Sequence, residues 1–406
     1  MADIRVGRKI DEGTGYGRPP QHVDDELVRV GPGTPCGELM RRYWHPIALS
    51  SEATTRPKNI RILGEDLILF RDRKGRPGLL YPRCMHRGTT LFYGKVEDEG
   101  IRCCYHGWLF GVDGTCLDQP CEPEHGLHRD VARQPWYPVE ERYGLVFAYL
   151  GPAEKKPILP RYDILEEIEP NQEILARQMG AQTGDGTMPV APYSWVHLND
   201  NVIDPYHVYV LHSTFSNVQF SHQFIIKPHQ VDFFQSDVGI CYSAVRDMGD
   251  GRLLDRVSSF IMPCIMSVPD TRGDLQHRRS SRIGWIVPMD DESFTTFTAG
   301  TINKGENALY QPLDFNGKTW AQMTEAEHQE TPGDYEAQAG QGTISLHSEE
   351  HLAQSDRGIV MMRRLLKEQM KLVAAGGDPM NVAFDQSKAT IKVPSGNFFR
   401  QKAAAE

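Results

Sequence analysis

The feature that most constrains this chain is a pair of short motifs in which each cysteine is followed closely by its own histidine. The motifs are a Cys-x-His unit and a Cys-x-x-His unit, Cys84 with His86 and Cys103 with His106. A zinc site of two cysteines and two histidines usually has closely spaced cysteines and places both histidines on a helix. Here the natural units are two separate loops. Gly88 and Gly107 follow the histidines and suit tight turns that let backbone N–H groups approach a bound group.

Two Cys/His loops of this kind predict a Rieske [2Fe–2S] centre, in which one iron takes two thiolates and the other takes two imidazoles. Each loop then supplies one ligand to each iron. A structural zinc knuckle and a chance cluster are the alternatives, and the coincidence of ligand residues, glycines and flanking aromatics disfavours both. Cys104 is the spare thiol, because the spacing to His106 selects Cys103, and we expect it to be a packed free cysteine. A third loop, Gly114 to Glu124, is expected to cover the cluster.

The composition is that of an ordinary globular protein. The 406 residues are 39% hydrophobic and 24% charged, enough for two or three domains with substantial cores. A net charge of −10 argues against nucleic acid as the main partner. No apolar leader and no run near the roughly 18 apolar residues of a membrane span is present, so we expect a cytoplasmic protein without membrane contact. The cysteines outside the motifs do not form a disulfide scaffold and are expected to be reduced and buried: Cys36, Cys116, Cys121, Cys241 and Cys264.

Strand and helix patterns divide the chain into three parts. Residues 1–45 predict an irregular arm and one short helix. Residues 46–152 contain evenly spaced short strands with glycine turns, typical of a small all-β domain that holds the cluster on hairpin loops. Residues 153–406 mix strand candidates with one long helix, Asp356 to Ala375, which predicts an α+β domain. Gly305 to Gly342 is polar and weakly periodic, a predicted loop or lid.

A second group of metal-binding side chains lies near His207 and His212. Five residues of regular α-helix turn through about 500°, so these side chains would point roughly 140° apart. Both can bind one metal only if the helix is broken or bulged between them, a distortion often found at functional sites. Pro205 would disturb the hydrogen bonding here. Non-haem Fe(II) oxygenases hold iron by two histidines and one carboxylate; two ordinary histidines on an amphipathic helix are the alternative.

Nearly the whole chain resembles the Rieske non-haem iron ring-hydroxylating oxygenases, and within them the phthalate dioxygenase-like branch. The resemblance is carried by the cluster motif with Gly107-Trp108 and Phe110, the pattern Asp200-x3-Asp204-x2-His207-x4-His212, the segments Gly31 to Pro35 and Arg41 to Pro46, and the helix after Asp356. It implies an N-terminal all-β Rieske domain followed by a helix-grip catalytic domain, an α+β chain overall. The implied cluster ligands are Cys84, His86, Cys103 and His106.

The resemblance also implies the ligands of a mononuclear Fe(II). His207 and His212 match the two histidines of the family motif, and Asp356 resembles the aspartate that opens the long C-terminal helix and binds iron. Glu349 and Glu350 are nearby carboxylates, read as solvated charges. A pure capping role is the alternative for Asp356, because a carboxylate in the first turn is favoured by the helix dipole.

Two further aspartates are expected to couple the metal centres. Asp204 matches the family's bridging aspartate, which implies His106 of a neighbouring subunit and His207 as its partners. A carboxylate that accepts N–H from both imidazoles would fix their orientation. Asp200, one helical turn earlier, is expected to polarise the same network, with a solvated acidic residue as the alternative.

Family membership implies the terminal oxygenase alpha subunit of a multicomponent enzyme. The implied assembly is a homotrimer or a dimer of trimers. A separate flavin and iron–sulfur reductase, or a ferredoxin, would bring electrons from NADH. The chain itself shows no G-x-G-x-x-G loop after a strand, so the residues also call for an external reductase.

The expected reaction uses O₂ to hydroxylate an aromatic compound, and we favour the cis-dihydroxylation of an aromatic carboxylate. Monooxygenation or O-demethylation of an aryl ether is one alternative, and a Rieske electron-transfer protein without its own catalysis is another. An anionic substrate needs a cation in the pocket. Arg246, on a predicted strand, and Lys227 are the candidates, with surface roles as the alternative.

Overall fold

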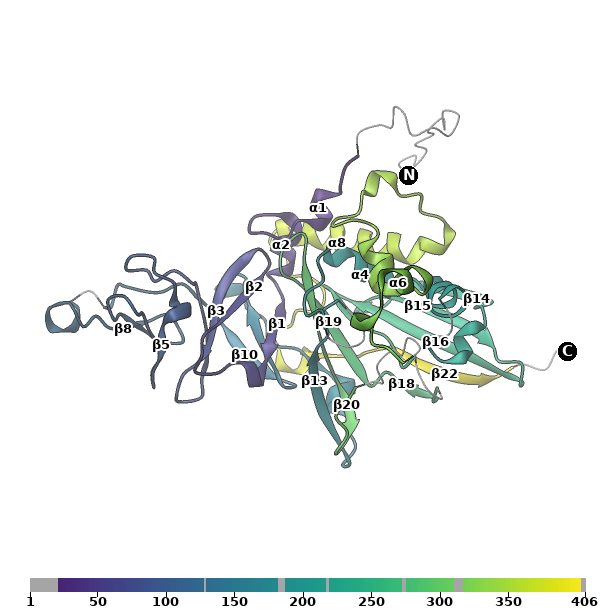
Figure 1. Cartoon of the computed structure of the whole chain (residues 1–406), viewed down its shortest axis with the longest axis horizontal. Coiled ribbons are helices and arrows are strands. Elements are labelled where there is room, and N and C mark those ends of the chain that lie inside the picture. Colours follow the sequence, from purple (N-terminus) through teal and green to yellow (C-terminus); the bar gives the residue numbers. More distant parts are fainter. Residues whose placement is uncertain are drawn as a thin grey trace.

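The structure is a computed structural model that describes residues 21–127, 129–181, 187–216, 219–271, 275–309 and 317–402. Figure 1 shows small sheets at one end of an elongated molecule and a large twisted sheet with helices at the other. Segments from both ends of the sequence meet in the larger part, where the N-terminal helices lie beside the C-terminal helix α8 (Arg357–Ala374).

The smaller part is built from three antiparallel sheets. One has the order β1-β11-β10, the next β2-β3-β4-β9, and the last β5-β6-β7-β8. Their strands are β1 (Trp44–Leu49), β2 (Lys58–Ile62), β3 (Glu65–Arg71), β4 (Pro77–Leu80), β5 (Lys95–Val96), β6 (Ile101–Arg102), β7 (Leu109–Phe110), β8 (Cys116–Asp118), β9 (Trp136–Tyr137), β10 (Val139–Arg142) and β11 (Leu145–Tyr149). The predicted all-β domain is therefore present, with a small core of its own that includes Phe70, Phe110 and the thiols of Cys84 and Cys103.

The larger part is organised on a nine-stranded sheet. Its main path runs β13-β20-β19-β17-β16-β15-β14, and β22 pairs with β16 and β18. The strands are β13 (Gln172–Gln178), β14 (Gln230–Gln235), β15 (Gly239–Asp247), β16 (Arg252–Ile261), β17 (Ile265–Ser267), β18 (Arg278–Arg279), β19 (Arg282–Pro288), β20 (Phe294–Asn303) and β22 (Gly396–Gln401). A two-stranded parallel pair, β12 (Arg161–Tyr162) with β21 (Thr390–Ile391), lies outside this sheet.

Helices cover one face of the large sheet, which confirms the α+β class (Figure 1). The longest, α8, spans almost the predicted range and buries one stripe: Met362, Leu365, Leu366 and Met370. The others are α1 (Asp25–Val28), α2 (Pro35–Met40), α3 (Asp163–Glu166), α4 (Trp195–Val202), α5 (Tyr206–Tyr209), α6 (Glu325–Glu330) and α7 (Asp334–Ala339). In the described ranges, no helix is both long enough and apolar enough to cross a membrane.

A shared hydrophobic core joins the two parts. Trp285 on β19 contacts Phe147 on β11 and Tyr162 on β12, with ring centroids 5.5 and 5.6 Å apart. The buried side chains around them form one continuous cluster that runs from α1 and α2 to α8. Packing of this extent fixes the relative orientation of the two parts, because dense cores resist sliding.

The cysteines follow the prediction in part. All eight are free, and the structure buries Cys36, Cys116, Cys241 and Cys264 as expected. Cys104 and Cys121 are exposed, so the prediction that they are packed is wrong. Both lie on the loops beside the predicted cluster, at the end of the small domain, where there is little core to cover a side chain.

The helix α8 provides a test of the fold. We expect Met362→Ala to lower the free energy of unfolding by about 2–5 kcal/mol, because the side chain is fully buried and its removal leaves a cavity. The matched control is Val360→Ala on the exposed face of the same helix, with an expected change within about 0.5 kcal/mol. Urea unfolding followed by circular dichroism measures both, and equal losses would contradict the packing of this face.

Candidate metal centres

The two predicted cluster loops have the same shape. In the first, the Gly88 N–H donates to the Cys84 carbonyl at 2.7 Å, and in the second the Gly107 N–H donates to the Cys103 carbonyl at 3.1 Å. Gly88 has φ +79° and Gly107 has φ +74°, a left-handed conformation that favours glycine. The two glycines therefore close the turns, as the sequence predicts.

The loops bring the four predicted cluster ligands together. The rings of His86 and His106 lie 4.6 Å apart, and the thiols of Cys84 and Cys103 are both buried. Burial and the neighbouring Cys103 thiol together raise the pKa of the Cys84 thiol to about 12, although the backbone N–H of His86 acts in the opposite direction. Adjacent buried thiols ionise readily only beside a cation. The donor set of two sulfurs and two imidazoles fits a [2Fe–2S] cluster.

Two further elements pack on these loops. The Trp108 ring stacks on His86, with centroids 4.6 Å apart. The predicted third loop contacts the second cluster loop, because a Cβ placed on Gly107 would lie 2.7 Å from Cγ of Pro120. The Cys121 thiol also donates to the His106 carbonyl at 3.7 Å. The third loop therefore covers one side of the site, as expected.

The helix break between His207 and His212 is present. The α-helical turn α5 ends at Tyr209, and the next residues form a π-helix, η5 (Val210–Phe215). A π-helix has a wider turn than an α-helix. The extra residue per turn brings the two imidazoles to one side, with ring centroids 5.4 Å apart. Pro205 precedes the first turn of α5. Local distortion of the helix thus provides what the five-residue spacing requires.

Asp334 completes the set of ligand atoms. Its Oδ1 lies 3.1 Å from Nε2 of His212 and 3.7 Å from Nε2 of His207, and the three ligand atoms lie within 4.8 Å of one another. Burial alone would raise the pKa of Asp334, but the charges of His212 and His207 hold it well below its usual range. Burial would lower the pKa of His207, but Asp204 and Asp334 raise it. Two imidazoles and one carboxylate on one face form the donor set of a non-haem iron site.

The prediction of Asp356 as the third ligand is therefore corrected to Asp334. Asp356 lies before α8, where its Oδ2 accepts the N–H of Ala353 at 2.7 Å, so it acts as a helix cap. Asp334 opens the short helix α7, inside the stretch predicted as a loop or lid. Both aspartates stand at a helix start, so the sequence offers no local signal that separates them.

Two side chains missed by the sequence analysis hold the ligands in place. Oε1 of Gln219 lies 2.7 Å from Nδ1 of His212, and Nδ2 of Asn201 donates to Oδ1 of Asp334 at 3.0 Å. The Gln219 contact favours a proton on Nδ1 of His212 and leaves Nε2 free to bind a metal. Asn201 follows Asp200 directly in the family-like pattern, which is the only signal that could have pointed to it.

Asp204 contacts His207 as predicted, on the ring nitrogen away from Asp334. Its Oδ2 lies 3.6 Å from Nδ1 of His207, and its Oδ1 accepts the Tyr206 N–H at 2.8 Å. Burial would raise the pKa of Asp204, but His207 lowers it below its ordinary value. The carboxylate is thus ionised and can orient the imidazole.

Asp200 does not join this network. Its carboxylate pairs with Arg363 on α8, which also pairs with Glu350. Burial raises the pKa of Asp200 to about 6, and Arg363 acts in the opposite direction. Side chains four residues apart share a helix face only within one regular helix, and α4 ends at Val202. The predicted role of Asp200 is therefore corrected: it links α4 to α8.

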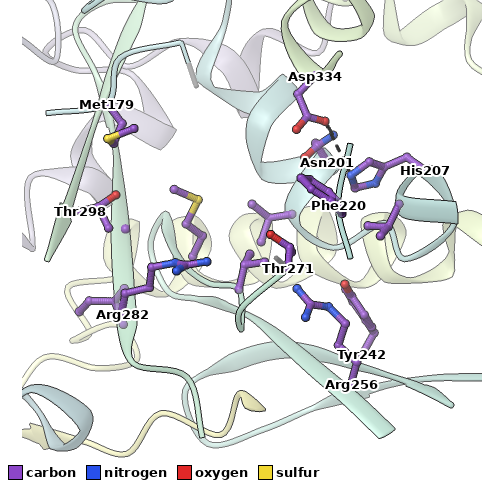
Figure 2. A pocket seen from close by; sticks show the side chains of 16 residues that line it. Met179, Asn201, His207, Phe220, Tyr242, Arg256, Thr271, Arg282, Thr298 and Asp334 are labelled. Atoms are coloured by element: carbon purple, nitrogen blue, oxygen red, sulfur yellow. Dashed lines mark hydrogen bonds and ion pairs between the residues drawn. The ribbon is translucent and has the colours of Figure 1, made fainter. Parts of the chain in front are cut away.

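A pocket of about 160 Å³ opens beside this site (Figure 2). His207, Asn201 and Asp334 lie at one end of it, and Arg256, Arg282, Tyr242 and Thr271 lie toward the other. Apolar side chains also line it: Val202, Val208, Phe220, Met266, Val268 and Ile283. An apolar cavity of about 150 Å³ can bind benzene, so this pocket accommodates an aromatic ring.

The predicted pocket cations are corrected as well. Arg246 is buried, its Nε donates to the Ile226 carbonyl at 2.9 Å, and it does not line the pocket. Lys227 is exposed and lies outside the lining too. Arg256 and Arg282, which the sequence analysis missed, are the arginines that line the cavity.

The cluster loops yield a test with an internal control. Cys103→Ser should abolish the visible absorption and the reduced-state electron paramagnetic resonance signal of a Rieske cluster, because a cluster thiolate is lost. Cys104→Ser, one residue away and exposed, should keep both. A cluster lost in the Cys104 variant and retained in the Cys103 variant would reverse the assignment.

The choice between Asp334 and Asp356 is tested by metal analysis. Asp334→Ala should lose about one of roughly three iron atoms per chain and keep the cluster spectrum, because one ligand of the mononuclear site is gone. Asp356→Ala should retain all the iron and lose only the hydrogen bond that closes the short 3₁₀ turn Gln354–Asp356 before α8. The opposite pattern of iron loss would restore Asp356 as the ligand.

Comparisons with known proteins agree with this geometry. The model of the family "Rieske [2Fe-2S] domain" matches residues 43–138. The chain is 54% identical over 390 residues to the phenoxybenzoate dioxygenase subunit alpha of Ectopseudomonas oleovorans, which covers 95% of this chain and 94% of that protein. It is 32% identical to the 5,5'-dehydrodivanillate O-demethylase oxygenase subunit of Sphingobium sp., over 92% of this chain and 84% of the relative.

Solved structures show the same fold at low sequence identity. NdmB of Pseudomonas putida CBB5 superposes with a TM-score of 0.60 at 18% identity, over 87% of this chain and 95% of the other. The structure of dicamba monooxygenase bound to dicamba superposes with a TM-score of 0.58 at 18% identity, over 82% of this chain and 98% of the other. Together with the extensive match to the Ectopseudomonas protein, the two metal-binding donor sets show that this chain belongs to the Rieske non-haem iron oxygenases, as an alpha subunit of the phthalate dioxygenase-like branch.

Proposed function

We propose that this terminal oxygenase hydroxylates an aromatic carboxylate, by cis-dihydroxylation, with electrons from a separate reductase. The observation that carries the proposal is the position of His207 and Asp334, which line the same pocket as the apolar side chains. A metal held there would face a bound ring directly. The relative at 54% identity is named for phenoxybenzoate, an aromatic carboxylate.

The two donor sets would hold two different iron centres. Cys84, His86, Cys103 and His106 would hold the [2Fe–2S] cluster, and His207, His212 and Asp334 would hold the mononuclear Fe(II). When bound, these groups store single electrons and activate O₂ beside the substrate. The Gln219 contact favours a proton on Nδ1 of His212, and the charged Asp204 carboxylate, 3.6 Å from Nδ1 of His207, favours one there, so that both Nε2 atoms stay available to the metal.

The pocket walls serve the reaction by excluding water. The apolar lining comes from Phe220, Val202 and Val208 near the metal ligands in the sequence, and from Met266 on β17 and Ile283 on β19. A water-poor pocket strengthens the electrostatic contacts inside it and limits side reactions. The dihydroxylation of a ring takes up O₂ with two electrons and two protons, and the electrons must come from outside the chain.

The arrangement of the chain favours electron transfer between subunits. The sheet that holds β5 and β8 lies at one end of the molecule, while α4 and α6 lie in the larger part, well apart from it (Figure 1). We infer a homotrimer or a dimer of trimers in which His106 of one subunit approaches Asp204 of the next. The electron donor would be a flavin and iron–sulfur reductase, or a ferredoxin, that draws on NADH. Eight free cysteines suit a cytoplasmic protein.

O-Demethylation or another monooxygenation is the second candidate. The Sphingobium relative is named an O-demethylase oxygenase subunit, and a further relative at 37% identity is named a tert-butanol monooxygenase. The same donor set and pocket would serve either reaction, since the position of the substrate decides which carbon is attacked. A carrier without catalysis is disfavoured by the complete set of three ligands, two of which, His207 and Asp334, line the pocket.

The proposal is tested by reductase-coupled turnover of benzoates, phthalates, phenoxybenzoates and methoxybenzoates, with products identified by mass spectrometry. A diol supports dihydroxylation, whereas a phenol with formaldehyde supports demethylation. His207→Ala should lose turnover by at least about 100-fold while its cluster is still reduced, because one iron ligand is missing. Full turnover in this variant, or no aromatic product with the wild type, would contradict the proposed function.

A further inference from the structure

The end of the pocket away from the metal ligands carries unusual positive charge. Arg256 and Arg282 both line it, beside Tyr242 and Thr271 (Figure 2). Arginine side chains rarely line an apolar cavity without a partner, because a buried charge is costly unless it is paired. The contacts of these two arginines therefore decide whether they are structural or bind a ligand.

Arg256 is almost fully buried, packs on the Phe224 ring, and donates its hydrogen bonds to neutral oxygens. Its terminal nitrogens donate to the carbonyls of Asp270 and Pro269, each at 2.9 Å, and to the side-chain oxygen of Asn397 at 3.0 Å. Its Nε has no hydrogen-bond partner in the described part of the chain. These contacts fix the guanidinium in place but do not neutralise it, which leaves a rigid positive charge beside the cavity.

One carboxylate is shared among the arginines of this region. Asp270 pairs with Arg282, at 3.0 Å, and with Arg278. Burial would raise the pKa of Asp270, but Arg282, Arg278 and Arg256 together hold it below its ordinary value. Burial lowers the pKa of Arg256, and the charge of Arg282 adds to that effect. Among the described residues, Asp270 thus lies near three guanidinium groups, and the two that line the pocket, those of Arg256 and Arg282, are placed to meet an incoming anion.

We propose that Arg256 and Arg282 form the anion-binding end of the pocket and bind the carboxylate of the substrate. The inference rests on the proposed function, and it assigns the carboxylate to two residues. Guanidinium groups suit this task because they stay charged and donate to carboxylate oxygens in a fixed geometry.

The assignment also fixes the direction of the substrate. His207 and Asp334 lie at the opposite end of the same pocket (Figure 2). A substrate with its carboxylate at Arg256 and Arg282 therefore presents the far edge of its ring system to the metal ligands. Oxidation is expected at carbons remote from the carboxylate, so substrates with a substituent or second ring at that far edge fit best.

Arg282 and Arg278 provide a matched pair for the test. Both pair with Asp270, but only Arg282 lines the pocket, and Arg278 is largely exposed. In the holoenzyme, Arg282→Gln should raise the Kd for 3-phenoxybenzoate about 10- to 100-fold, the loss expected for a hydrogen bond to a charged group. The Kd for the neutral 3-phenoxybenzamide should change less than about threefold. Arg278→Gln removes the same charge and should leave both values within about threefold.

The same two Kd values are measured for Arg256→Gln, and thermal unfolding checks that this variant folds. If it folds, it should lose acid binding as Arg282→Gln does; if it unfolds, the Arg282 and Arg278 pair decides. Equal effects of Arg282→Gln on the acid and the amide, or equal effects of the two variants on the acid, would overturn the assignment. Failure of the wild type to oxidise any aromatic compound would instead contradict the proposed function, which separates the two conclusions.

Discussion

The site depends on holding three ionisable ligands, His207, His212 and Asp334, within 4.8 Å of one another inside the protein. Burial opposes the charged form of each of them. The chain offsets this cost with ordered contacts: Asn201 donates to the carboxylate, and Gln219 fixes one imidazole. The remaining requirement, a positive charge at the centre of the three, is met by a metal ion. The need to bring these groups together explains why the backbone departs from regular helix here.

Contacts from the surrounding fold stabilise the irregular helix that carries His207 and His212. A π-helix is less stable than an α-helix and persists where other contacts hold it. The Ser213 hydroxyl donates to the carbonyl of Tyr209 and binds that of Phe224, which ties the widened turn to the next segment. The Asp200–Arg363 ion pair fixes α4 to the long helix α8, and so positions Asn201. Asp200 thus supports the metal site through helix packing rather than through the imidazoles.

The parts that the sequence could predict are those whose signals are local. All cluster ligands fall between Cys84 and His106, and the break after His207 follows from helix geometry. Asp334 lies far along the chain and resembles Asp356 in its local setting, so only the fold distinguishes them. The sequence also could not decide which arginine lines the pocket, Arg246 or Arg256. Residues Arg246 and Arg256 both lie 5.0 Å from the Phe224 ring centre, on paired strands, yet the cavity reaches only Arg256.

The pocket separates two electrostatic environments, and this separation constrains how a ligand can enter. The metal end already holds the carboxylates of Asp334 and Asp204, so a substrate carboxylate placed there would compete with a protein ligand for the metal. The far end holds the guanidinium groups of Arg256 and Arg282. The apolar walls of the pocket offer no partner to a charged group. A molecule with one carboxylate and one ring therefore has a single favourable orientation, so the charges of the pocket, more than its shape, select the carbons presented to the metal.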